Sequence, residues 1–169
     1  ELREAVCAKF ARDNGLEYRP EQVLVSGGAK QSLFNLCVAL LGPCDEAIIP
    51  SPYWVSYPEM VRLTEATPVI VDTGIESHFK VEPGQLEAAL SPRTRLLVMN
   101  SPSNPTGAAY SAAELAAIGE VLNDYPDVVV ASDESRLSET ASVQFREMLR
   151  VEAAALGVDA DAVHRHIHA

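Results

Sequence analysis

The segment 100–107 contains residues that could position an amide for chemistry. It reads Asn-Ser-Pro-Ser-Asn-Pro-Thr-Gly and follows the run 95–99, which has the apolar character and length of a buried strand. Two prolines and a glycine exclude a continuous helix or strand here. We therefore predict a rigid loop at the carboxyl end of a strand, where open α/β sheets bind ligands, with the Asn104 amide aimed by its flanking prolines. A tight turn without a ligand, in which this amide bonds to its own loop, is the alternative.

A second segment has the composition of an anion-binding turn. Residues 26–30 read Ser-Gly-Gly-Ala-Lys between a predicted strand and a predicted helix. Free backbone N–H groups and the helix dipole favour an anion such as phosphate at such a place. The glycines would let the backbone approach that anion closely. The same residues also fit a glycine turn that binds nothing.

Two single side chains complete the chemically interesting set. Trp54, the only tryptophan, comes at the carboxyl end of a predicted strand and could stack on a flat ring. Asp133 ends the apolar run 128–131, where its partly desolvated carboxylate would favour the charged form of a nearby base. The alternatives are a core tryptophan and an acid that caps a helix.

Taken together, these motifs resemble those of the class I/II aminotransferases, pyridoxal-phosphate enzymes of fold type I, and the aspartate aminotransferase branch is the nearest likeness. The resemblance covers roughly residues 1–134, and the motifs occur in the family's order. They are Ser-Gly-Gly-Ala-Lys-Gln at 26–31, Ser-Pro-Tyr-Trp-Val-Ser-Tyr-Pro at 51–58, the segment 100–107, and Ser-Asp-Glu at 132–134.

The resemblance implies pyridoxal 5'-phosphate as cofactor and a role for each candidate residue. The amides of Gly28, Ala29 and Lys30 would contact the cofactor phosphate. Trp54 would stack on the pyridine ring, Asn104 would bond to its 3-oxygen, and both would border the substrate. Asp133 would hold the pyridine nitrogen protonated, as the partner of the electron sink.

The chain departs from the family pattern at the catalytic group. Its three lysines are Lys9, Lys30 and Lys80, whereas the family's Schiff-base lysine follows the Asp133 strand. Arg136 replaces the usual tyrosine, and the family's substrate-binding arginines come from a C-terminal part that is missing here. We therefore assign no catalytic residue and predict a cofactor site without its covalent anchor.

Apolar runs alternate with helical patterns along residues 1–134, which predicts an α/β fold with a doubly wound, mainly parallel sheet of about five strands. The predicted strands are 22–26, 46–50, 68–72, 96–100 and 127–132, and the predicted helices are 1–14, 29–41, 54–64, 83–90 and 111–125.

The family's large domain has seven strands, so this sheet would be incomplete. The fourth, fifth, second and third strands would pair in that order, and 23–26 would lack its family neighbours. We divide the chain into a partial cofactor-binding domain, 1–134, and a helical tail, 135–169, based on the spacing of Leu137, Ala141 and Phe145. A chain that opens inside a helix also predicts a missing N-terminal piece.

The composition limits the kinds of molecule that the chain is expected to bind. A net charge of −11 argues against nucleic acid and anionic membranes. The absence of long apolar runs and of a signal-peptide pattern predicts a soluble, cytoplasmic protein. Cys7 and Cys37 fit small core positions, and the histidines at 164, 166 and 168 fit a solvated tail better than a metal site.

We therefore predict the cofactor-binding part of an aminotransferase that moves an amino group between an amino acid, aspartate as first guess, and a 2-oxo acid. By itself the chain would be inactive, and the full-length family would form homodimers. The alternatives are another fold type I enzyme, such as a C–S lyase or decarboxylase, and a non-catalytic or degenerate scaffold that binds pyridoxal phosphate.

Overall fold

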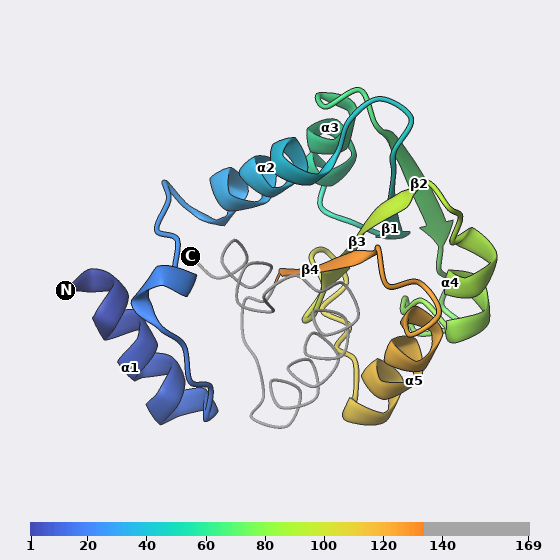
Figure 1. The fold of residues 1–169 in the computed structure, drawn as a ribbon. Coiled ribbons are helices and arrows are strands. Elements are labelled where there is room, and N and C mark those ends of the chain that lie inside the picture. Colours follow the sequence, from blue (N-terminus) through green and yellow to red (C-terminus); the bar gives the residue numbers. More distant parts are fainter. Residues whose placement is uncertain (134–169) are drawn as a thin grey trace.

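The computed structural model describes residues 1–133. In this part of the chain, helices and strands alternate after an N-terminal helical segment (Figure 1). The strands are β1 (Glu46–Ser51), β2 (Thr67–Asp72), β3 (Thr94–Asn100) and β4 (Val129–Asp133). The helices are α1 (Leu2–Asn14), the 3-10 helix η1 (Pro20–Gln22), α2 (Ala29–Leu40), α3 (Ser56–Arg62), α4 (Pro83–Ala89) and α5 (Ala112–Leu122).

The four strands form one parallel sheet in the order β2-β1-β3-β4. The α/β class and the parallel pairing are therefore confirmed, but the predicted order, with the fifth strand beside the second, is wrong. Helices α4 and α5 lie on the same face of the sheet, and parallel crossovers are right-handed. The steps β2 to β3 and β3 to β4 therefore run in the same direction, and β3 comes to lie between β1 and β4.

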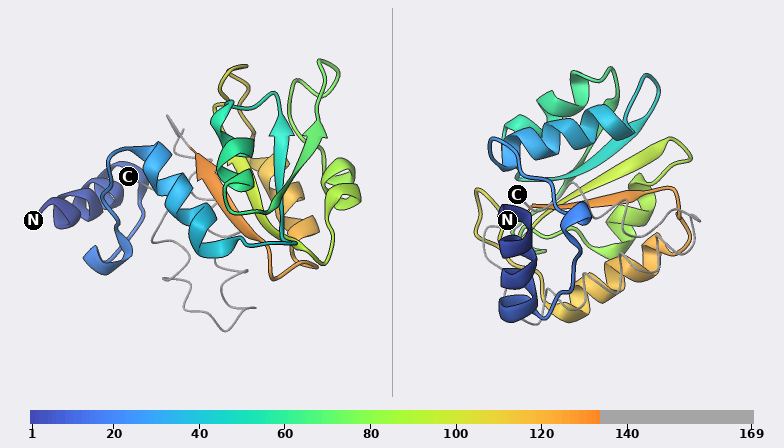
Figure 2. Two further views of the ribbon diagram at one scale, coloured as in Figure 1. Left: turned by 90° about the horizontal axis from the view of Figure 1, so that it is seen from above. Right: turned by 60° about the vertical axis from the view of Figure 1, so that its left-hand side comes forward.

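Two layers of helix cover the sheet, so both of its faces are buried (Figure 2). Successive strand residues point to opposite faces, which is why continuous apolar runs encode these strands. Towards α4 and α5 the strands present Ile48, Val71, Leu97, Met99 and Val130, which meet Leu86, Leu115, Ile118 and Leu122.

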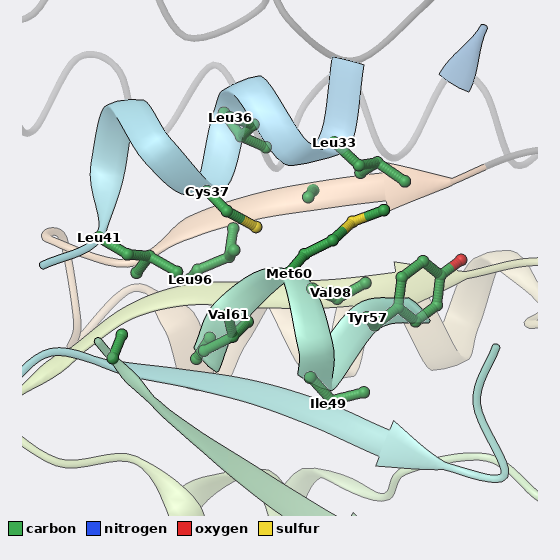
Figure 3. Close-up of a cluster of buried hydrophobic side chains, with 13 residues drawn as sticks. Leu33, Leu36, Cys37, Leu41, Ile49, Tyr57, Met60, Val61, Leu96 and Val98 are labelled. Carbon is green, nitrogen blue, oxygen red and sulfur yellow. The ribbon is translucent and has the colours of Figure 1, made fainter. Parts of the chain in front are cut away.

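Towards α2 and α3 the strands present the alternate set, Ala47, Ile49, Leu96, Val98 and Ala131. These side chains meet Leu33, Leu36 and Cys37 from α2 and Tyr57, Met60 and Val61 from α3 (Figure 3). Tyr57 lies at one end of this cluster, with its hydroxyl group directed away from the packed side chains.

The predicted strand 22–26 is absent. Gln22 ends η1, and residues 23–26 form no ladder with any described residue. Val23 is buried, but Val25 is 48% exposed. A strand needs a neighbour for its backbone groups, and within residues 1–133 β4 pairs only with β3. The sheet of the described residues therefore has four strands instead of the predicted five.

Helix α1 forms as predicted and ends at Gly15, which adopts a left-handed conformation with φ 62°. Leu2, Val6 and Phe10, which recur every four residues along this helix, are not buried, however. The helix contains no buried residue, Leu2 is 62% exposed, and α1 lies apart from the four strands (Figures 1 and 2). Phe10 meets Tyr18 edge to face at a centroid distance of 5.5 Å. Cys37 is a core residue as predicted, whereas Cys7 is only half-buried.

The start of α5 shows how the local sequence sets a helix boundary. Ser111 and Glu114 form a capping box, in which each side chain accepts a hydrogen bond from the other residue's backbone N–H. None of the helices in residues 1–133 is long and apolar enough to cross a membrane. The predicted helical tail 135–169 lies outside the described residues.

Leu97 provides a test of this core, because its side chain is fully buried between the central strands and α5. The substitution Leu97→Ala should lower the free energy of unfolding by about 2–5 kcal/mol, the usual cost of such a cavity. Leu63→Ala is the matched control, since Leu63 is 72% exposed and should change stability by less than about 0.5 kcal/mol. Urea denaturation measures both, and equal effects would contradict the assignment of Leu97 to the core.

Candidate functional site

The N-terminus of α2 presents unpaired backbone amides. Gly28 caps the helix with φ 108° and ψ 164°, a conformation that favours glycine strongly. Within residues 1–133, no acceptor bonds to the N–H groups of Gly28, Ala29 or Lys30, and all three residues are exposed. Together with the helix dipole, these amides form what we call the amide cradle, which is suited to an anion.

Side chains of the same segment hold the cradle in shape. The Ser26 hydroxyl donates to the Gly28 carbonyl at 3.1 Å and lies 2.6 Å from the Ser32 hydroxyl. The Gly27 N–H donates to the side chain of Gln31 at 2.6 Å. The turn therefore keeps its conformation through its own hydrogen bonds and does not depend on a ligand for them.

Trp54 follows β1 and connects the cradle to α3. The Lys30 ammonium lies 4.6 Å from the centre of the indole ring, within the range of a cation–π contact. The ring of Tyr57 meets the indole edge to face at 5.5 Å. Trp54 is half-buried, so part of its ring remains accessible at the carboxyl end of the sheet.

Asp133 is the last residue of β4, and its carboxylate accepts a 2.5 Å hydrogen bond from the Tyr57 hydroxyl. Tyr57 is only 4% exposed. Burial, the hydrogen bond to Asp133 and the charge of that carboxylate raise the pKa of Tyr57 well above its usual range. The phenol therefore remains a donor, and one carboxylate oxygen stays directed towards it.

Sequence reasoning assigned no role to Tyr57. The residue belongs to the motif 51–58, but its partner lies 76 residues further along the chain. Its position three residues after Trp54 was the only available signal, and helical spacing alone would place it in the core. The structure shows that it is both a core residue and a polar contact of Asp133.

Asn100 joins Asp133 to the loop that carries Asn104. Its side-chain amide donates to the main-chain carbonyl of Asp133 at 2.6 Å, and its side-chain oxygen accepts the Asn104 N–H at 2.6 Å. The Asn104 side chain is exposed and has no hydrogen-bond partner within residues 1–133. It is therefore not bonded to its own turn, which was the alternative to a ligand-binding role.

A continuous series of contacts runs through the predicted residues. It passes from Lys30 to Trp54, Tyr57, Asp133, Asn100 and Asn104. No hydrogen bond or ion pair of the described chain joins the cradle amides directly to Asp133 or Asn104. The two halves of the site, the cradle and the strand ends, are thus related through Trp54 and Tyr57 and through the packing of α2 on the sheet.

Metal binding finds no support in the described residues, which contain no group of three or more histidine, cysteine or carboxylate side chains placed to hold an ion. The histidines at 164, 166 and 168 lie outside the part of the chain that the structure describes. What the arrangement offers is an anion site, an aromatic face, a carboxylate and a free amide at one edge of the sheet.

The raised pKa of Tyr57 gives a pH test of this geometry. Its phenol should stay protonated above about pH 10, where a solvent-exposed phenol ionises. The stability that this group contributes is complete below about pH 10 and is lost as pH rises through the folded pKa. In an alkaline absorbance titration, Tyr57→Phe should therefore remove one phenol that ionises only above about pH 10. The variant should also lose less stability above about pH 10.

Tyr110→Phe is the matched control. Tyr110 is also buried, its pKa is raised to about 12, mainly by burial, and its hydroxyl accepts the Val81 N–H instead of bonding to Asp133. Both variants should lose one phenol that ionises above about pH 10, but only Tyr57→Phe should leave the Asp133 carboxylate without its donor. If Tyr57→Phe leaves the number of such phenols unchanged, the assignment of Tyr57 to a buried contact with Asp133 is wrong.

Comparison with known proteins is consistent with this geometry. The family model "Aminotransferase class I and II" matches residues 1–135. The chain is 56% identical over 133 residues to an aspartate/prephenate aminotransferase of Nitrosomonas europaea and 59% identical over 134 residues to one of Cereibacter sphaeroides. Each match covers 79% of this chain and 34% of the relative, so the chain spans about a third of their length.

Solved structures show the same likeness. The aspartate aminotransferase of Rhizobium meliloti matches with a TM-score of 0.78 and 32% identity, over 98% of this chain and 52% of that one. The Thermus thermophilus aspartate aminotransferase with maleate matches with a TM-score of 0.75 and 35% identity, over 98% and 53%. On the strength of the family model and these relatives, the chain belongs to the class I and II aminotransferases.

Proposed function

We propose that this chain forms the phosphate- and ring-binding part of a pyridoxal-phosphate site in an aspartate-aminotransferase-like enzyme. The reaction is reversible transfer of an amino group between an amino acid and a 2-oxo acid. The observation that carries the proposal is the series of contacts from Lys30 to Asn104, because it relates an anion site to a carboxylate and an amide across one edge of the sheet.

The residues present fit the cofactor that the family uses. The amide cradle has unpaired donors for a phosphate, and Gly28 keeps the backbone free of a side chain at that place. Trp54 offers an aromatic face for a pyridine ring, and the free Asn104 amide suits the ring's 3-oxygen. When bound, pyridoxal phosphate supplies the aldehyde and the electron sink for amino transfer.

Asp133 is suited to hold a proton on the ring nitrogen. Tyr57 donates to one of its carboxylate oxygens, and within residues 1–133 no side chain bonds to the other. A carboxylate so placed favours the protonated form of a nearby nitrogen base. Tyr57 thus orients the acid from the core side and leaves an oxygen for the ligand side.

The chain by itself is proposed to bind the cofactor without performing the reaction. Lys9, Lys30 and Lys80 are its only lysines, and Lys30 is directed over Trp54. The names of the relatives favour aspartate as amino donor, with prephenate as a candidate 2-oxo acid. Assembly as a homodimer and a cytoplasmic location are part of the same proposal.

Two alternatives remain within the proposal. Another fold type I activity, such as a C–S lyase or decarboxylase, would use the same cradle and ring contacts. The second is a non-catalytic scaffold that binds pyridoxal phosphate. Assays with candidate substrates distinguish the first alternative from amino transfer.

Pyridoxal phosphate should bind to this chain noncovalently, and fluorescence of Trp54, the sole tryptophan, should report its titration. Gly28→Ala should weaken binding about tenfold, because an L-residue at φ 108° carries backbone strain of about 1–3 kcal/mol and shifts the cradle. Gly84→Ala is the matched control, since that glycine lies in α4 with open space around it.

Borohydride reduction of the same complex tests for a covalent bond. No lysine should be labelled stoichiometrically, because none is placed by the sequence as the family's anchor. Stoichiometric labelling of Lys9, Lys30 or Lys80 would contradict the noncovalent site.

For the titration of the glycine variants, equal affinities of the Gly28→Ala and Gly84→Ala proteins would show that the cradle does not hold the phosphate.

The chain supplied with pyridoxal phosphate should not transaminate aspartate with 2-oxoglutarate faster than the free cofactor does. The reason is the missing lysine, without which the proton transfers of the reaction have no positioned base. A coupled assay for oxaloacetate measures the rate. Turnover above the background that is lost in Asp133→Ala would mean that another group of this chain replaces the lysine.

A further inference from the structure

The geometry points to Asn100 as a positioning residue that fixes the loop bearing Asn104 relative to the Asp133 end of β4. The inference rests on the proposed function for the identity of the ligand. It concerns a residue that the motif analysis placed in the loop without a role. The evidence is the pair of hydrogen bonds that the Asn100 side chain makes to two different elements.

The first of these bonds reaches across the sheet. Asn100 and Asp133 are register partners at the last position of the β3–β4 ladder. The Asn100 amide donates to the Asp133 carbonyl at 2.6 Å, and the Ser101 N–H donates to the same oxygen at 3.3 Å. The Asp133 carbonyl at the end of β4 thus accepts two hydrogen bonds from residues at the base of the loop.

The second bond reaches along the loop. The Asn100 side-chain oxygen accepts the Asn104 N–H at 2.6 Å, which closes a turn over residues 100–104. An asparagine side chain has both a donor and an acceptor, so one residue serves both contacts. Within residues 1–133, no other side chain bonds to both Asp133 and Asn104.

The rest of the loop is held by bonds of its own. The Ser103 N–H donates to Ala108 at 2.8 Å, and the Gly107 N–H donates to Ser103 at 2.7 Å. The Tyr110 N–H donates to the Ser101 hydroxyl at 3.1 Å. These contacts fix the shape of the loop, and the Ser101 N–H ties its base to Asp133. Among the described side chains, only that of Asn100 bonds to both Asp133 and Asn104.

This division of tasks explains why Asn104 can act although it is exposed. Its side-chain amide has no partner in the described residues, so its backbone position sets the region of space that the amide can reach. Displacements near 1 Å can cost about a hundredfold in rate at such a site. A hydrogen bond to the Asn104 N–H restrains that displacement at the residue itself.

Amide hydrogen exchange of the cofactor-free chain tests the positioning directly. Asn100→Leu removes both contacts at nearly constant volume. The backbone N–H of Asn104 should then exchange its hydrogen about tenfold faster or more. Asn100→Asp keeps the acceptor oxygen, so it should retain most of the Asn104 protection. Asn123→Leu is the matched control, since Asn123 is the C-cap of α5 and, among the described residues, its side chain donates only to Glu120, at 3.4 Å.

Cofactor titration provides the second readout. Asn100→Leu should weaken pyridoxal phosphate binding about tenfold, whereas Asn123→Leu should bind like the unaltered chain. A donor to the ring's 3-oxygen favours its ionised form. The pH midpoint of the absorbance change of the bound cofactor should therefore move upwards in Asn100→Leu, an effect that a loss of packing alone would not produce.

Unchanged Asn104 exchange in Asn100→Leu would overturn the inference, and so would equal loss of protection in Asn100→Leu and Asn100→Asp. If Asn100→Leu also exposes the amides of β3 and β4, the fold has been lost, and Asn100→Asp then decides the question alone. Failure of the unaltered chain to bind pyridoxal phosphate would contradict the proposed function, while the exchange data would still decide whether Asn100 fixes the loop.

Discussion

The pairing of β3 with β4 is the contact on which the candidate site depends. It places Asn100 and Asp133 side by side at the carboxyl end of the sheet. From there, one residue orients the loop and the other carries the carboxylate. The pairing is secured by the buried side chains Leu97, Val130 and Ala131, which lie between helices on both faces. A change of one residue in register would exchange those faces and separate Asn100 from Asp133.

Tyr57 links this sheet edge to the hydrophobic core. Its ring packs with Met60 and Val98, and its hydroxyl bonds to Asp133 (Figure 3). A buried hydroxyl without a partner would cost about 1–3 kcal/mol, so packing of the ring and bonding of the hydroxyl favour the same rotamer. The position of the carboxylate is thereby coupled to the packing of α3 and does not depend on the surface loops.

Much of the site could be predicted from local sequence, because glycine turns and proline loops encode their own backbone geometry. Gly28 precedes a helix and the segment 100–107 follows a strand, as expected, although the strand predicted before Gly28 is absent. The failures have a different origin. Residues 22–26 have strand composition but no partner strand in the described chain, and the Tyr57 contact spans 76 residues. The order of the strands likewise follows from which face each helix covers, and local patterns do not contain that information.

The two halves of the site differ in how they tolerate the absence of a ligand. The cradle amides of Gly28, Ala29 and Lys30 are exposed, so water can satisfy them at little cost. The Tyr57 hydroxyl is buried, and the protein itself supplies its partner. An empty cradle therefore leaves no buried polar group unpaired, whereas loss of Asp133 would. It follows that the contact of Tyr57 with Asp133 belongs to the folded core, whereas the cradle amides need no ligand for the fold to be stable.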